Sequence, residues 1–333
     1  MVHTAMRRVV VLVLLAGIGL AGPTAPARAA GTVAFGAAQS SSPGVSRQQA
    51  VSALEGSIQR QLAFVRSYDL WDSPFPDSTE AALDSSGHGL FMSVKAKRTS
   101  GAFVPWAAIA AAGPGDPLYQ DMVSWANRLK AFATPVTFSF NHEAETSNSA
   151  GSGTATQYVA AYRAFAGVIR QSGATNVRLA WTSAVRNFSA APGSASYAPA
   201  FYPGDAWVDD LAVDAYNMYC RRADGQFSRP WRSLQQLLDP WLAFAAQHPG
   251  PQMVVAEWGS PEDPAATGRK AQWIDDAHAL FKQPAYARVR AVSYWNQLSH
   301  NFAGCDFRVT SSPSALAAFT AMGKDPFYSG TVR

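Results

Sequence analysis

Two stretches of the chain run from an apolar, partly β-branched segment straight into polar and acidic side chains. The first covers residues 135–145 and the second covers residues 252–260. Apolar segments without a helical period, followed by polar or glycine-rich loops, are typical of central strands in α/β proteins. We therefore expect two buried strands whose carboxyl ends carry Glu143 and Glu257.

Elsewhere the pattern alternates between strand and helix. Short apolar runs predict six more strands, at residues 32–37, 62–68, 90–95, 176–181, 210–216 and 289–295. Apolar positions at helical spacing predict helices between most of them, one capped by Ser46 and the others at residues 116–132, 158–169, 233–247, 270–281 and from about 314. We expect a polar loop with room for a short helix at residues 72–89, and another loop that carries Trp106.

Eight strands with helices between most of them predict a single-domain α/β fold, the (β/α)8 barrel. Parallel strands need crossover connections, and the fixed hand of those crossovers winds the strands one way around. The chain has 333 residues, 48% of them hydrophobic, which is enough for a barrel of roughly 250 residues. An open doubly wound sheet is the alternative, although the mature sequence lacks dinucleotide-binding or P-loop glycines.

The amino-terminal residues 1–30 have the pattern of a secretory signal peptide. Arg7 and Arg8 precede an apolar run at residues 9–21, and small residues around Arg28 offer a cleavage site. The run is too short for a membrane span, so we expect a secreted protein with no membrane contact after processing. Removal takes away three arginines and no acid, and the formal net charge falls from +4 to +1. The mature charge therefore predicts no nucleic-acid partner.

The chain contains two cysteines, Cys220 and Cys305. An even count in an exported protein favours one disulfide over two free thiols, and their positions after the sixth and eighth strands place both at the same mouth of the barrel. They lack the C-x-x-C spacing of a structural zinc site, and the histidines show no H-E-x-x-H spacing. We expect no metal, no cofactor and a monomeric chain.

Barrel enzymes carry their chemistry on the loops that follow the strands. The polar and aromatic residues at the expected strand ends are Asn141, His142, Glu143, Trp181, Asp214, Tyr216, Asn217, Glu257, Trp258 and Trp295. Two carboxyl groups among aromatic rings suit glycoside hydrolysis, in which one carboxylic acid protonates the leaving oxygen and one carboxylate attacks the anomeric carbon. Tryptophan faces hold sugar rings. The expected partner is therefore a polysaccharide substrate.

Four short motifs, in order, resemble glycoside hydrolase family 26, the β-mannanase family among the barrels with catalytic glutamates on strands four and seven. The motifs are Asn141-His142-Glu143, Tyr202-Pro203-Gly204-Asp205, Asp214-Ala215-Tyr216 and Glu257-Trp258-Gly259. The resemblance covers most of the mature chain. It implies that residues 31–333 form a (β/α)8 hydrolase domain that cleaves O-glycosyl bonds with retention of configuration.

The resemblance also implies roles for individual residues. Glu143 would be the acid/base and Glu257 the nucleophile, His142 would contact the sugar near the cleaved bond, Tyr216 would orient Glu257, and Trp295 would stack on a sugar. Asn141, Trp181 and Trp106 are further candidate substrate contacts, with core packing or simple hydrogen bonding as the alternative for His142, Tyr216 and each tryptophan.

Geometry and ionisation follow from a retaining mechanism. The two carboxyl groups should lie about 5 to 5.5 Å apart. Glu143 must be protonated when substrate binds, and we expect Phe138, Phe140 and a nearby negative charge to raise its pKa.

Several functions stay open beside the first choice, an endo-acting β-mannanase. Ser139 and Phe140 stand where family 26 mannanases usually have Arg and Pro, so a β-1,3-1,4-glucan or a xylan is an alternative substrate. A carbohydrate-binding protein that has lost turnover is a second class, although it would not need both glutamates. A structural wall protein is a third, and its usual repeats and low-complexity stalks do not occur in the sequence.

Overall fold

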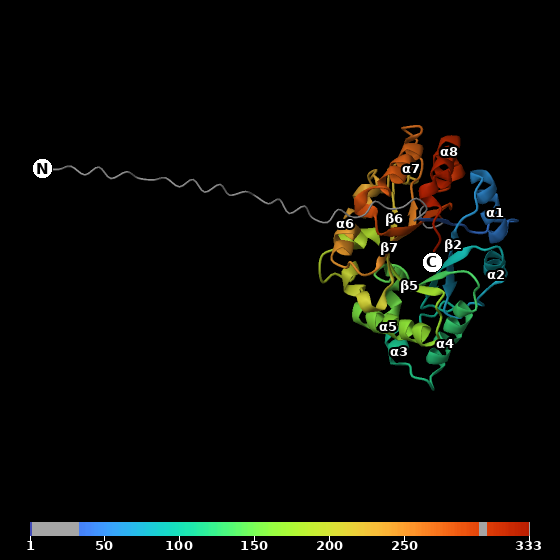
Figure 1. Cartoon of the computed structure of the whole chain (residues 1–333), viewed down its shortest axis with the longest axis vertical. Helices are drawn as coiled ribbons and strands as arrows, with labels where there is room; N and C mark the ends of the chain where they lie inside the picture. Colours follow the sequence, from blue (N-terminus) through green and yellow to red (C-terminus); the bar gives the residue numbers. More distant parts are fainter. Residues whose placement is uncertain (2–32, 300–304, 333) are drawn as a thin grey trace.

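The computed structural model describes Met1, residues 33–299 and residues 305–332. Apart from Met1, the expected signal peptide at residues 1–30 lies outside the described residues. Eight parallel strands pair in chain order and close into one barrel, which confirms the predicted (β/α)8 fold (Figure 1). The strands are β1 (Ala34–Ala38), β2 (Phe64–Leu70), β3 (Gly89–Lys95), β4 (Val136–Phe140), β5 (Val177–Ala184), β6 (Asp210–Tyr216), β7 (Gln252–Gly259) and β8 (Val289–Trp295).

Helices surround the strands in Figure 1. They are α1 (Arg47–Ile58), α2 (Ser78–Ser85), α3 (Trp106–Ala111), α4 (Pro117–Lys130), α5 (Ala155–Gln171), α6 (Leu234–Ala246), α7 (Arg269–Leu280) and α8 (Pro313–Lys324). Ser46 begins α1 with a capping box, as expected, and Thr154 and Ser233 begin α5 and α6 in the same way. Local sequence signals therefore set where several helices start.

One helix was not predicted from the sequence. The segment expected to be a loop carrying Trp106 forms α3, which follows Pro105 and contains four alanines among its six residues. Proline fixes the backbone at the helix start, and alanine has the highest helix propensity. The helix is short, which is why a pattern of apolar spacing does not reveal it.

The barrel interior is narrow and is filled mainly by small side chains. Alternate strand positions point inward, and the lumen contains a cluster of mostly small buried residues: Ala34, Phe64, Phe91, Ala180, Ala212, Val254, Ala256, Ala291 and Val332. Larger side chains on the same strands point outward and pack against the helices in the main core. A barrel lumen is a packed core rather than a pore, so chemistry is confined to the mouth.

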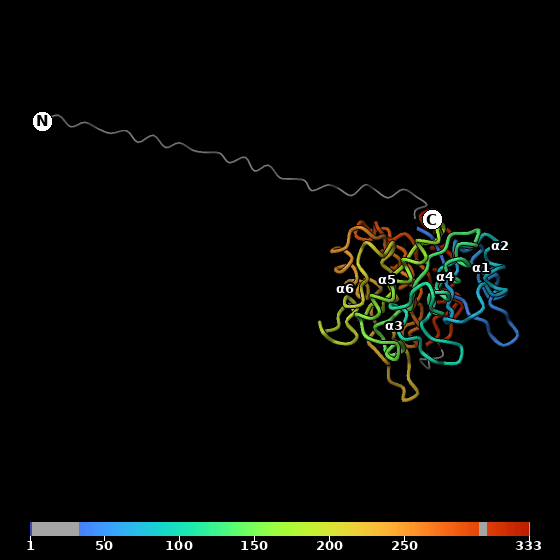
Figure 2. The backbone as a smooth tube through the Cα atoms, turned by 90° about the horizontal axis from the view of Figure 1, so that it is seen from below, coloured from blue at the N-terminus to red at the C-terminus, as the bar shows by residue number. Residues whose placement is uncertain are grey.

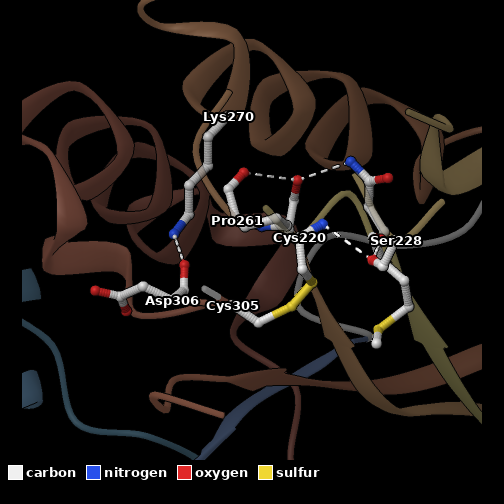
Figure 3. The surroundings of a disulfide bond; sticks show 9 residues. Cys220, Ser228, Pro261, Lys270, Cys305 and Asp306 are labelled. Carbon is white, nitrogen blue, oxygen red and sulfur yellow. Dashed lines mark hydrogen bonds between the residues drawn. A yellow bond between two sulfur atoms is a disulfide. The ribbon is translucent and has the colours of Figure 1, made fainter. Parts of the chain in front are cut away.

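The carboxyl ends of β6 and β8 are tied together covalently. Cys220 follows β6, Cys305 follows β8, and they form a disulfide across a separation of 85 residues, which confirms the predicted pair (Figure 3). The Lys270 ammonium group on α7 donates to the carbonyl oxygens of Asp306 and Arg308 beside this bond. The loops after β6 and β8 are thus held against each other at one end of the barrel.

The two ends of the barrel differ in what they carry. The antiparallel bridge between Arg221 and Phe227 makes a hairpin after β6, which projects at the end away from the carboxyl terminus of the chain (gold in Figure 2). The end with the hairpin, here called the mouth, contains the candidate site.

Among the described residues no helix is long and apolar enough to cross a membrane.

Candidate active site

A cleft of about 900 Å³ opens at the mouth of the barrel. Its walls come from the loops after five successive strands: His142 and Glu143 after β4, Arg186 after β5, Asp214 and Tyr216 at the end of β6, Glu257 on β7 and Trp295 on β8. Both predicted catalytic glutamates therefore face one cavity. Their location at the carboxyl ends of strands is that of the functional groups in (β/α)8 barrels.

A register shift turns Glu257 into the mouth. On β6, Ala212 faces the lumen, and Asp214 follows two positions later on the same face. Val213 pairs with Val255 on β7, but Asp214 pairs with Glu257, so Ala256 is an extra residue on β7. Such bulges re-aim side chains beside functional sites. Without it, Glu257 would point outward, because neighbouring strand residues alternate between faces.

The carboxyl group of Glu257 is held from both sides. The Tyr68 hydroxyl donates to one oxygen at 2.5 Å, and the Tyr216 hydroxyl donates to the other. The Arg66 guanidinium group pairs with the Tyr68-bonded oxygen at 3.3 Å. Burial raises the pKa of both tyrosines well above their ordinary value, so both remain hydroxyl donors. These contacts fix the orientation of Glu257 and favour its negative charge.

Glu143 lies in a different environment. Its backbone has φ of 51°, a left-handed conformation that is uncommon for residues other than glycine, and its amide donates to the Thr182 carbonyl at 2.9 Å. No hydrogen bond to its carboxyl group is formed within the described part of the chain. Burial raises the pKa of Glu143 to about 8, and the charges of Glu257 and Glu145 act in the same direction. Glu143 is therefore protonated at neutral pH.

The expected cause of this raised pKa was wrong in part. The nearby negative charge is present, but Phe138 and Phe140 point out of the barrel and pack against Phe165 on α5. Strand residues that precede a catalytic residue by three or five positions do not necessarily face the same cavity. The desolvation of Glu143 comes instead from its depth in the mouth.

Aromatic groups surround the two glutamates. The Tyr68 ring lies 5.3 Å from the His142 ring and 5.6 Å from the Trp295 ring, and Tyr216 lies 6.0 Å from Trp295. His142, Tyr216 and Trp295 are partly exposed and line the cleft. Burial, together with Arg66 and Lys95, lowers the pKa of His142 well below its ordinary value, so the imidazole is neutral.

Three predicted substrate contacts do not reach the cleft. Asn141 is fully buried, where its side chain accepts from the Ala96 amide and donates to the Ser149 hydroxyl. Trp181 points out of the barrel and packs against Phe188 and Phe244. Trp106 begins α3 and packs against Tyr158 and Phe201. These side chains have no exposed surface to offer a sugar, so the structure corrects their predicted role.

Sequence reasoning did not select three residues that the structure places beside Glu257. Arg66 and Tyr68 come from β2, and the Arg66 guanidinium group lies 4.4 Å from the Tyr68 ring centre. An arginine inside an apolar strand is unusual, because buried charges need partners, and that signal could have identified the position. Asp214 was noted at its strand end but was given no role.

Asp214 is buried in the mouth without protein partners. Its relative exposure is 2%, and neither carboxyl oxygen has a hydrogen-bond partner among the described residues. Burial raises the pKa of Asp214 well above its ordinary value, and the charges of Glu257 and Glu143 add to the shift. The protonated form of Asp214, which burial favours, can both donate and accept a hydrogen bond in the cleft.

Possible metal ligands were sought among the acidic, histidine and cysteine side chains. Among the described residues there is no group of three or more His, Cys, Asp or Glu side chains that could hold a metal ion.

Comparisons with known proteins agree with this architecture. No family model matches the chain. A curated relative, Endoglucanase H of Acetivibrio thermocellus, is 32% identical over 162 residues, which is 49% of this chain and only 16% of that protein. The chain therefore matches about a sixth of the length of that relative.

Solved structures match over nearly the whole described chain. An endo-β-1,4-mannanase double mutant from Cellulomonas fimi has 19% identity and a TM-score of 0.58, covering 89% of this chain and 71% of that one. The GH26 β-mannanase BoMan26A from Bacteroides ovatus has 17% identity and a TM-score of 0.59, with 89% and 90% covered. GH26C from Muricauda sp. has 14% identity and a TM-score of 0.61, with 89% and 86% covered.

Two of these neighbours are named as members of glycoside hydrolase family 26, the family that the sequence motifs resemble, and the likeness confirms the fold that this resemblance implies. At such low identity the likeness establishes the fold. The chemistry of this chain has to be argued from its own residues.

Proposed function

We propose that the protein is a retaining endo-β-glycanase, with Glu257 as the nucleophile and Glu143 as the acid/base. The observation that carries the proposal is the contrast between the two carboxyl groups in one cleft. Glu257 is bound by two hydroxyl donors and an arginine, whereas Glu143 is unbonded and its pKa is raised to about 8. Two carboxyl groups in such different surroundings can serve as one acid and one nucleophile in the same cleft.

In the first step Glu143 gives its proton to the glycosidic oxygen while a Glu257 oxygen attacks the anomeric carbon. The carbon–oxygen bond to the leaving sugar breaks, and a covalent glycosyl-enzyme forms. Tyr68 and Tyr216 keep the Glu257 carboxylate oriented toward the cleft. The neutral His142 and Asp214 are placed to bond sugar hydroxyl groups, since each has polar atoms without a partner among the described residues.

In the second step the ionised Glu143 takes a proton from water, and the resulting hydroxide attacks the anomeric carbon. The bond to Glu257 breaks and the configuration is retained after two inversions. Formation of the ester removes the negative charge of Glu257, which is one of the causes of the raised pKa of Glu143. Glu143 thereby becomes a stronger acid only when it must act as a base.

β-Mannan is the first substrate we propose, followed by β-1,3-1,4-glucan and xylan. The names of similar proteins support the first two substrates, because the structural neighbours include mannanases and the curated relative is named an endoglucanase. Ser139 does not disturb the mouth. It lies inside the barrel, where its hydroxyl donates to Thr182 at 2.9 Å. We also propose that the protein is secreted after removal of residues 1–30, as the sequence of that segment predicts.

A reducing-end assay on mannan, mixed-linkage glucan and xylan tests the proposal. Hydrolysis of any of them supports the glycanase. Binding without hydrolysis would instead favour a carbohydrate-binding protein that has lost turnover. The Glu143→Gln variant is the control, because it keeps the shape of the side chain but cannot donate the required proton.

A further inference from the structure

Three arginine side chains line one flank of the cleft. Arg186 follows β5, and Arg229 and Arg232 lie between β6 and α6; these three residues are here called the arginine flank. All three are exposed. Among the described residues no acidic side chain forms an ion pair with any of them, and every Asp and Glu of the sequence lies in that part of the chain. The charge of Arg186 acts on Glu143 and opposes the rise of its pKa, but no ion pair compensates the positive charge of the flank among the described residues.

The acidic residues of the cleft do not neutralise this flank. Glu257 already pairs with Arg66. Desolvation raises the pKa of Glu143 to about 8, so it is mostly protonated at neutral pH, and burial also raises the pKa of Asp214, which disfavours its negative charge. The cleft is consequently electropositive on the side of β5 and β6. Such a lining concentrates anions, since low-dielectric walls focus the field of the charges.

The segment that carries Arg232 is fixed in place. Its backbone amide donates to the Asn217 side chain at 3.1 Å, and its carbonyl accepts from the Trp273 ring at 2.9 Å. The Tyr219 ring stacks on the Phe227 ring, with 3.8 Å between their centres, and lies 5.4 Å from the Trp231 ring, so these contacts brace the hairpin next to Arg232.

The disulfide between Cys220 and Cys305 ties the same loop to the segment that follows β8 (Figure 3). The backbone that carries Arg229 and Arg232 is thus held in place before any ligand binds, which lowers the entropic cost of binding.

The first turn of α6 adds to the positive field. Ser233 caps this helix, and Gln236 and Leu237 of its first turn line the cleft beside Arg232. A helix amino terminus carries a partial positive charge, so it favours an anion at the same place. Met218 and Pro230 provide apolar surface between these charges, which suits the face of a sugar ring.

We propose that the arginine flank selects an anionic β-glycan, whose sugar units carry uronic-acid carboxylates or sulfate half-esters. Guanidinium groups bind both anions through paired N–H donors, whereas a neutral mannan would leave three cations unpaired beside it. This inference rests on the proposed function, because the anionic sugars would occupy subsites next to the bond that Glu143 and Glu257 cleave.

The test compares matched polymers and matched variants. The polymers are glucuronoxylan and its carboxyl-reduced form, and a sulfated β-glycan and its desulfated form. The variants are Arg229→Gln with Arg232→Gln, and the control Arg222→Gln. Arg222 lies on the hairpin, pairs with Asp224 at 2.9 Å and is not part of the cleft lining. Retardation in gels that contain each polymer reports binding, and reducing ends report hydrolysis.

The parent protein should bind one charged polymer at least about tenfold more tightly than its neutral form, and the pair that shows this preference identifies the anion. The double variant should lose most of this preference, because each exposed arginine is expected to contribute about a two- to fivefold factor to the ratio of the two affinities. The control should keep it. Equal binding of charged and neutral polymers, or an unchanged ratio in the double variant, would refute the arginine flank as the selector. Arginine-dependent binding without hydrolysis would refute the glycanase and leave the selector standing.

Discussion

Two aspartates four positions apart on β6 have opposite surroundings. Asp210 lies deep in the barrel, where its two oxygens accept four hydrogen bonds from Arg178 and Arg290 at 2.6 to 3.0 Å. These guanidinium groups hold the pKa of Asp210 below its ordinary value, despite the opposing effect of burial. Asp214 lies at the mouth with neither oxygen bonded among the described residues, and burial raises its pKa well above the ordinary value.

The difference between the two aspartates distinguishes a residue that stabilises the barrel, Asp210, from one that is available to bind a ligand, Asp214. A buried polar group without a partner costs stability, so proteins normally satisfy such groups. At Asp210 the chain supplies the partners itself. At both oxygens of Asp214 and at the Nδ1 atom of His142 it does not, and these residues line the cleft. We interpret the unsatisfied mouth as the place where a bound sugar supplies the missing hydrogen bonds.

The largest expected effect comes from the nucleophile at the mouth. Glu257→Ala should reduce turnover by on the order of 10⁴-fold or more, because no group remains to form the covalent intermediate. Added azide should restore part of the activity on an activated glycoside, with a product of inverted configuration. Circular dichroism checks that the variant is folded. Substantial activity without azide would show that another residue attacks the sugar.

At Asp210, the first residue of β6, the expected effect of a substitution is on stability. Asp210→Asn leaves the buried Arg290 without its countercharge and should lower the free energy of unfolding by about 3 kcal/mol or more. Urea unfolding at pH 7 measures the change. The contribution of Asp210 is present above the pKa of an unfolded aspartate, about 4, and is lost as pH falls through its lowered folded-state pKa. A neutral result would mean that the network is not needed for the fold.

The acid/base should reveal itself in the pH dependence of activity. Glu143 must be protonated in the free enzyme, so kcat/KM should fall as pH rises through about 8. Glu257→Gln removes one of the charges that raise this pKa, and the titration of Glu143, followed by carboxyl NMR, should move to lower pH. The comparison with the parent protein is direct, because Gln keeps the size of the side chain. A titration of Glu143 near pH 4 in both proteins would contradict the assignment.

The smallest stability effect is expected at Asp214. Asp214→Asn should change the free energy of unfolding by less than about 1 kcal/mol near pH 4, because it replaces a neutral group by a neutral group of equal size. As pH rises above about 4 the unfolded parent ionises while folded Asp214 stays protonated, so the parent loses stability and the variant gains relative to it. Paired urea curves from pH 4 to 8 measure this trend. A variant that loses stability as Asp210→Asn does would remove the distinction between the two sites.

Most of the fold could be predicted because strand and helix signals are local. The bounds expected for β6 and β8 agree with the structure, and the Ser46 cap is where the sequence places it. The direction of side chains was harder to predict. Trp181 follows Ala180 on a strand that is buried on both faces, so no polar alternation marks which residue faces the lumen. The narrow lumen favours the alanine inside, and a rule based on size would have placed Trp181 against the helices.

The site could be predicted only in part, for a related reason. Glu143 and Glu257 follow apolar runs and were found, but the bulge at Ala256 that turns Glu257 inward leaves no mark in the sequence. Arg66 and Tyr68 reach Glu257 from β2, nearly 190 residues away, and such pairings depend on the closed barrel. Burial of Trp106 against α5 likewise follows from tertiary packing.

Covalent trapping tests the division of roles most directly. The protein is incubated with a 2-deoxy-2-fluoro glycoside of the sugar whose polymer it cleaves, activated by a dinitrophenyl leaving group, and the labelled peptide is identified by mass spectrometry. Fluorine slows both formation and breakdown of the glycosyl-enzyme, and the good leaving group restores the rate of formation alone, so the intermediate accumulates. The account predicts one adduct per chain, on Glu257. An adduct on Glu143 or Asp214, or hydrolysis with inversion and no adduct, would contradict it.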